Sequence, residues 1–268
     1  MAHRFTFEAL ERTLRDVMSS YHNSKTIFGG KVIVFGGDFR QILPVVPRGS
    51  RSDIVHASIN ASKIWDHRKV LTLTQNMRLQ RNGTSDEVKK FSDWILKVGE
   101  GKLAVPNDGY AEIDIPKELL IVDYDEHIHA IVQSTYPKLI ENYMSQHYLQ
   151  SRAILASTIE VVDQINNYVL SLIPGLPNHK ITLKIGTPIM LMRNLDQSEG
   201  LCNGQSLDNV GLYLPKEVFS HGQLYVAISR VTTKEGLKIL IYDKDKKADN
   251  IVPTTTTNVV FKEVFANL

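Results

Sequence analysis

The chain has 268 residues, of which 43% are hydrophobic and 22% are charged, a composition typical of a globular protein rather than a disordered one. Its 31 Lys and Arg residues nearly balance its 29 Asp and Glu residues, and the formal net charge is +2. The total charge therefore neither supports nor excludes a nucleic-acid partner. The single cysteine, Cys202, excludes an intrachain disulfide and fits a reducing compartment. Because no apolar run reaches 18 residues and no secretory signal is visible, we expect an intracellular protein without a membrane span.

The first hundred residues alternate between helical and strand patterns. Apolar residues at helical spacing predict an amphipathic helix over residues 5–20. The apolar run Val32–Phe35 predicts a short buried strand, Lys31–Phe35, between two Gly-Gly pairs, and Val70–Leu73 predicts a second one. Ser85 is a candidate cap for a helix that ends near Gly99.

The rest of the chain continues this alternation. The patterns predict a mostly helical stretch over 126–144 with a break at Pro137, a strand Arg152–Ala156, a helix from Ser157-Thr158 to Leu172 that ends at Pro174-Gly175, a strand pair Ile181–Ile185 and Pro188–Met192, a helix Val218–Arg230, a strand Leu237–Tyr242 and a charged loop over 243–250. Strands that alternate with helices favour an α/β fold with mainly parallel sheets. In such sheets ligands bind beyond the carboxyl ends of the strands.

The stretch GGDFRQ places polar side chains directly after the first predicted strand. Gly36 and Gly37 would let the backbone turn tightly and approach a ligand. Arg40 could then clamp a phosphate through two parallel hydrogen bonds, and Gln41 could both donate and accept. The same residues also fit a plain turn with Arg40 as a solvated charge, and spacing alone does not choose between the two interpretations.

Two further arginines follow apolar stretches. Arg78 comes shortly after a predicted strand in LTLTQNMR, and Arg230 ends the apolar helix in YVAISRV. Each arginine alone is typical of a structural side chain that snorkels from an apolar element. Together with Gln41 they could form a phosphate-sensing set, since transfer of a phosphoryl group requires positive charge.

Several other kinds of site are disfavoured. His127 and His129 are two residues apart and do not share a helical face, and one cysteine without paired ligands argues against structural zinc, so we predict no metal site. The pattern Gly-x-x-x-x-Gly-Lys-[Ser/Thr], which cradles the phosphates of ATP, does not occur in these 268 residues.

Several long stretches resemble one family of DNA helicases. GGKVIVFGGDFRQILPVVPRGSR is similar to motif III of the PIF-type (petite integration frequency) helicases, in particular the plant Helitron-associated branch, and LTLTQNMRL is similar to motif IV. AILASTIEVVDQINNYVLSLIPG and GLPNHKITLKIGTPIMLMRNLDQSEGLCNG resemble the second motor domain of that family. FSHGQLYVAISRVTTKEGLKILI resembles motif VI, and NVVFKEVFANL resembles the C-terminal tail.

The resemblance implies remnants of two RecA-like α/β motor domains that use ATP and Mg²⁺ at their interface and move 5′ to 3′ on single-stranded or forked DNA. It implies a first domain over 1–80, a connecting helical region over 81–150 and a shortened second domain over 151–268. By resemblance, Gln41 and Arg78 would contact the γ-phosphate and Arg230 would be the arginine finger.

The resemblance also implies supporting residues and a biological setting. Asp38 and Phe39 would shape the loop between nucleotide and DNA, and Gln205 belongs to what resembles a remnant of the DNA-contacting motif V. Nucleus or mitochondrion, and a role in DNA repair, recombination, telomere maintenance or transposition, are family expectations.

Departures from the family lead to three hypotheses. The phosphate loop and the Asp-Glu magnesium motif would lie upstream of Met1, and family segments are expected to be missing after Gly175 and after Gly204. The chain is then a helicase fragment that is inactive alone, a non-catalytic transposon-derived remnant that binds DNA or protein, or a mis-assembled gene model.

Overall fold

The structure is a computed structural model that describes residues 1–18, 26–73, 86–104, 108–173, 206–243 and 253–266. Within these ranges the helices are α1 (Arg4–Met18), α2 (Arg51–His56), α4 (Asp86–Gly99), α5 (His127–Thr135), α6 (Leu139–Asn142), α7 (Gln146–Gln150), α8 (Ile159–Leu172) and α9 (Gln223–Ile228). The strands are β1 (Tyr110–Asp114), β2 (Arg152–Ala156), β3 (Asn209–Leu214), β4 (Leu237–Ile241) and β5 (Thr255–Val259). Short 3₁₀ turns cover Ile27–Gly30, Ile59–Ala61, Lys63–His67, Lys117–Leu119 and Lys262–Phe265. No helix in the described part of the chain is both long and apolar enough to cross a membrane.

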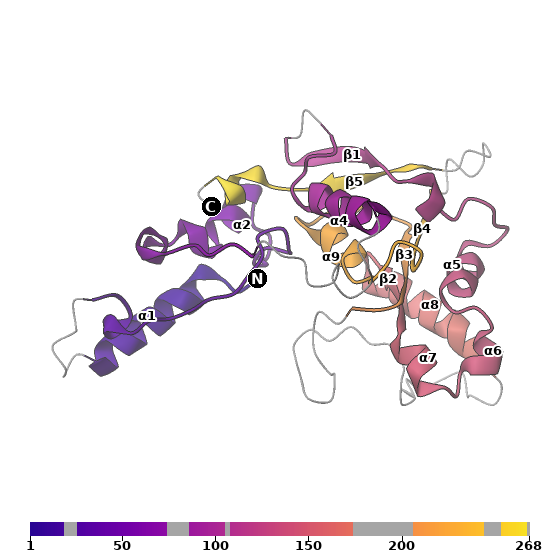
Figure 1. Cartoon of the computed structure of the whole chain (residues 1–268), viewed down its shortest axis with the longest axis horizontal. Helices are drawn as coiled ribbons and strands as arrows, with labels where there is room; N and C mark the ends of the chain where they lie inside the picture. The colour runs from indigo at the N-terminus through magenta and orange to yellow at the C-terminus, as the bar shows by residue number, and fades with distance from the viewer. Residues whose placement is uncertain (19–25, 74–85, 105–107, 174–205, 244–252, 267–268) are drawn as a thin grey trace.

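A parallel three-stranded sheet in the order β2-β3-β4 organises one side of the molecule (Figure 1). Alternate side chains of β3 point to opposite faces of this sheet. Tyr213 packs into the apolar cluster formed with α5 and α8, and Leu212 packs into the cluster formed with α4, α9 and β5. Helices therefore cover both faces, and the predicted α/β fold class with a parallel sheet is confirmed, in a form compatible with a RecA-like domain.

Several predicted elements are confirmed along the chain. The amphipathic helix near the N-terminus is α1, the helix that ends at Gly99 is α4, and the strand 152–156 is β2. The predicted helical stretch 126–144 is broken beside Pro137 into α5 and α6. The helix expected after Ser157-Thr158 is α8, although its cap residue Thr158 makes no side-chain capping hydrogen bond.

Two predicted strands in the first eighty residues are wrong. Residues 31–35 and 70–73 are not in strands, and most of their side chains are exposed, with Val32 91% and Leu73 96% exposed. Gly36 and Gly37 are not in a turn; the turn lies at Asp38–Gln41, where the Gln41 N–H donates to the Asp38 carbonyl at 3.0 Å. An apolar run becomes a buried strand only when another strand supplies its backbone partners, and the described residues of this region contain no strand.

Three strands were not predicted. β1 and β5 form a two-stranded antiparallel sheet, and β3 is the central strand of the parallel sheet. The predicted helix 218–230 is confirmed only over its middle, as α9. Ser85, Pro174-Gly175, the predicted strand pair over 181–192 and the charged loop over 244–250 lie outside the described residues.

The C-terminal segment, residues 260–266, connects the two sides of the molecule. Figure 1 shows it continuing from β5 to the side that holds α1 and α2, where the C-terminus lies close to α2. There Arg51 of α2 pairs with Glu263 at 2.9 Å, and the Asn60 side chain donates to the Val264 carbonyl at 3.0 Å. The region 81–150 also contributes β1 to the sheet with β5, and the domain boundaries at 80 and 150 stay predictions.

Candidate functional site

The Asp38–Gln41 turn packs directly against the start of α9. Gly222, the residue before α9, has a φ of +71°, a conformation that L side chains rarely adopt. A Cβ atom at Gly222 would lie 2.2 Å from the Arg40 carbonyl oxygen, closer than any real contact of that kind. The two backbones therefore touch at a point where only glycine fits.

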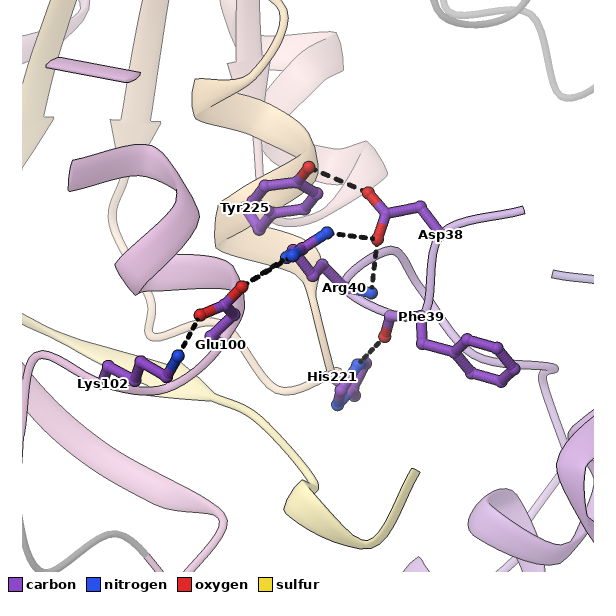
Figure 2. Close-up of polar contacts among 7 residues, drawn as sticks. All are labelled: Asp38, Phe39, Arg40, Glu100, Lys102, His221 and Tyr225. Carbon is purple, nitrogen blue, oxygen red and sulfur yellow. Dashed lines mark hydrogen bonds and ion pairs between the residues drawn. The ribbon is translucent and has the colours of Figure 1, made fainter. Parts of the chain in front are cut away.

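Asp38 receives three hydrogen bonds that hold the turn to itself and to α9. Its Oδ1 accepts from the Arg40 backbone N–H at 3.0 Å and from the Arg40 guanidinium at 3.3 Å, and its Oδ2 accepts from the Tyr225 hydroxyl at 2.9 Å (Figure 2). This carboxylate thus links a residue of the turn to one that is 187 positions later in the sequence.

Arg40 points toward the C-terminal end of α4, not toward solvent. Its Nη2 and Nε both donate to one oxygen of Glu100, at 2.6 and 3.2 Å, and Lys102 pairs with the other oxygen at 2.6 Å (Figure 2). Burial works against both charges in the pair. The hydrogen bonds from Lys102 and Arg40 outweigh this burial and hold the pKa of Glu100 below its usual value, while the partners Glu100 and Asp38 raise the pKa of Arg40.

Arg40 is therefore not a solvated charge, and in this arrangement its guanidinium is occupied by carboxylates. Gly99 completes the contact, since a Cβ atom there would lie 2.6 Å from the Tyr225 ring and 3.0 Å from the Arg40 side chain. Three segments that are far apart in the sequence, the turn, the end of α4 and α9, meet in one polar cluster.

His221 adds a second link between the turn and α9. It is 2% exposed, and its Nε2 lies 2.8 Å from the Phe39 carbonyl oxygen (Figure 2). The Phe39 ring packs edge-on against Trp65 at a centroid distance of 5.7 Å. Phe39 is therefore held by its backbone on one side and by its ring on the other.

The predicted site residues are placed as follows. Gln41 is exposed and lies beside Gly222 at the N-terminal end of α9. Arg230 is half-buried and lies just beyond the C-terminal end of α9, where its carbonyl accepts from the Leu207 N–H at 2.7 Å. Arg78 and Gln205 lie outside the described residues.

Gln41 and Arg230 are thus at opposite ends of α9. A helix of six residues is about 9 Å long. Their roles at a phosphate stay predictions.

The sequence did not reveal Glu100, Tyr225 or His221 as members of the cluster. His221 and Tyr225 stand in the stretch FSHGQLYVAISRV, whose likeness to motif VI marked it as functional. Their partners are more than 180 positions away, and no local pattern encodes such a contact.

A helicase is expected to bind nucleotide and magnesium, and magnesium requires oxygen ligands such as carboxylates. No group of three or more His, Cys, Asp or Glu side chains that could hold a metal ion occurs in the described ranges. The carboxylate of Asp38 is already engaged by Arg40 and Tyr225. The described carboxylates therefore do not form a magnesium site.

Two family models match the chain: PIF1-like helicase over residues 1–109, and the 2B domain of DNA helicase Pif1 over residues 170–212. The chain belongs to the family of PIF1-type helicases. A comparison with curated proteins finds no match.

The family matches include only part of the cluster. The Asp38–Gln41 turn and Glu100 lie inside the first matched range, whereas His221 and Tyr225 lie outside both. The second range spans both positions, after Gly175 and after Gly204, at which the sequence predicts missing segments. Use of nucleotide and metal, and binding of DNA, follow for the family as a whole.

Proposed function

We propose that this chain carries the nucleotide-sensing and DNA-binding parts of an ATP-dependent DNA helicase that moves 5′ to 3′. The observation that carries the proposal is the match to PIF1-like helicase over residues 1–109, a range that includes the Asp38–Gln41 turn. In this proposal Gln41, Arg78 and Arg230 contact the γ-phosphate, and the turn passes the state of the nucleotide to α9.

We further propose that the 268 residues by themselves do not hydrolyse ATP at the rate of a helicase. Cationic side chains stabilise a transferring phosphoryl group only when other groups hold the nucleotide in place. The phosphate-loop pattern that would do so is not found in the 268 residues. Phosphate release by the purified chain should stay at background with and without DNA, and Arg230→Ala should change nothing.

Binding without turnover is the second candidate function, and it is favoured by the same missing pattern. Fluorescence anisotropy with a labelled single-stranded oligonucleotide measures the DNA binding that both candidates require, and phosphate release distinguishes binding alone from turnover. A few phosphate contacts predict an affinity that falls about tenfold between 50 and 200 mM salt.

Three outcomes are informative. Salt-dependent binding without phosphate release supports both statements above. DNA-stimulated release that Arg230→Ala abolishes shows that the chain is a complete motor. Absence of binding to both single-stranded and forked DNA overturns the DNA-binding part of the proposal.

A further inference from the structure

His221 lies between two backbone segments that belong to different parts of the molecule. The Phe261 N–H, in the C-terminal segment, donates to His221 Nδ1 at 2.8 Å, and His221 Nε2 lies 2.8 Å from the Phe39 carbonyl oxygen. A backbone N–H can only donate and a carbonyl can only accept. The ring is therefore neutral, with its proton on Nε2, and it satisfies one donor and one acceptor at the same time.

The C-terminal segment has anchors on both sides of this ring. The rings of Phe261 and Phe265 lie at centroid distances of 5.6 and 6.1 Å from the imidazole. The Gly222 N–H donates to the Val259 carbonyl at 3.0 Å, so the residue next to His221 also holds the end of β5. The segment, the imidazole and the Asp38–Gln41 turn thus form one continuous chain of contacts.

We propose that His221 is a positioning residue that couples the C-terminal segment to the Asp38–Gln41 turn, so that order in one segment depends on order in the other. The coupling arises because the two hydrogen bonds share one buried imidazole ring. Its consequence, that the C-terminal segment helps to position Gln41, rests on the proposed function.

The surroundings of His221 keep the ring neutral at pH 7. Burial lowers the pKa of His221 below its ordinary value of 6.5, against the Phe39 carbonyl and the charges of Glu263 and Asp38, which favour the protonated ring. The other charged and titratable groups on the elements packed around it are Arg40, Tyr225, Arg51 and Lys262. A proton on Nδ1 would replace an acceptor with a donor, and the Phe261 N–H would lose its partner.

Two substitutions each remove one of the two hydrogen bonds of His221 and keep the other. An asparagine amide reaches the position of Nδ1, so His221→Asn keeps an acceptor for the Phe261 N–H and loses the bond to Phe39. A glutamine amide reaches the position of Nε2, so His221→Gln keeps a donor for the Phe39 carbonyl and loses the bond to Phe261. Neither side chain takes up a proton near neutral pH.

Amide hydrogen exchange of the full 268-residue chain tests the coupling. We expect each variant to speed exchange about fivefold in both segments, residues 38–43 and 260–265, because each loses one net hydrogen bond from the shared chain of contacts. Faster exchange confined to the segment whose own bond was removed overturns the coupling and leaves His221 as two independent local contacts.

A pH series on the unchanged chain gives a second readout that does not depend on the variants folding. After correction for intrinsic exchange rates, both segments should lose protection together, with one midpoint, as the pH falls below 6.5. Loss of protection in one segment only, or at two separate midpoints, contradicts the proposal. These results are independent of DNA binding and phosphate release, so a failure here is distinguishable from a failure of the proposed function.

Discussion

Replacing Gly222 with alanine tests how closely the Asp38–Gln41 turn packs on α9. The new Cβ atom would lie 2.2 Å from the Arg40 carbonyl oxygen and 2.8 Å from the Gln41 carbonyl carbon. Both are backbone atoms and cannot rotate out of the way as the end of a flexible side chain can. The turn or the start of α9 must therefore move by about 1 Å to restore an ordinary contact.

The magnitude follows from two costs. A non-glycine residue at a φ of +71° costs about 1–2 kcal/mol because its Cβ crowds the following carbonyl. Forcing extra atoms into a packed contact costs about 1–3 kcal/mol more. Gly222→Ala should therefore lower the free energy of unfolding by about 2–5 kcal/mol, a large part of the roughly 5–15 kcal/mol of a typical domain.

Urea unfolding followed by tryptophan fluorescence measures this change. The chain has two tryptophans, and Trp65 packs edge-on against Phe39 of the turn. The matched control is Gly37→Ala, one residue before the turn, where a Cβ atom meets nothing within 4 Å and φ is not positive. The free energy of unfolding of the control should stay within about 0.5 kcal/mol of that of the unchanged chain. If Gly222→Ala stays within that range too, the tight packing of the turn on α9 is refuted.

Three further predictions concern the polar cluster, each measured by urea unfolding. Tyr225→Phe removes the hydrogen bond to Asp38 and should lower the free energy of unfolding by about 1 kcal/mol. An unchanged urea midpoint would mean that water replaces this hydrogen bond without loss of stability. Arg40→Lys keeps the charge but cannot reproduce the paired donors to Glu100, and should cost about 1 kcal/mol after allowance for solvent screening; a cost equal to that of Arg40→Ala would show that charge contributes nothing. The pKa of Glu100 is lowered in the folded chain, so its contribution is complete above its ordinary pKa of 4.5 and is lost as the pH falls further. The stability difference between the unchanged chain and Glu100→Gln should therefore shrink below pH 4.5, and a constant difference from pH 6 to 3.5 would refute this.

Local patterns predicted the elements whose signal is contained in their own residues. The helical spacing of apolar residues in α1, α4 and α8 and the apolar run in β2 need no knowledge of distant partners. β3 was missed because its central Gly211 weakens the strand pattern. A Cβ atom at Gly211 would lie 2.1 Å from the Thr135 hydroxyl, so the glycine is required by the close approach of α5.

The strand predicted at 31–35 is wrong because its formation depends on residues outside the segment. Its composition is that of a buried strand, but pairing and burial are properties of the surroundings. β5 is the reverse case, because its local sequence predicts no strand and it forms one through its pairing with β1, some 145 positions away. In the same way the resemblance selected the stretches that contain Asp38 and Tyr225, but it did not predict that they would bond to each other.

The arrangement of α9 determines what the predicted phosphate contacts would require. Gln41 lies beside the N-terminal end of this helix and Arg230 beyond its C-terminal end, and the helix between them is about 9 Å long. The turn is fixed to the N-terminal end by the backbone contact at Gly222 and by the Asp38–Tyr225 bond. Rotating α9 alone would therefore carry the turn with it and leave this separation unchanged. If Gln41 and Arg230 contact one phosphoryl group, either their extended side chains span the gap or the bonds of the turn to α9 break first. The second route predicts that weakening the cluster, as in Tyr225→Phe, eases the motion that brings Gln41 and Arg230 together.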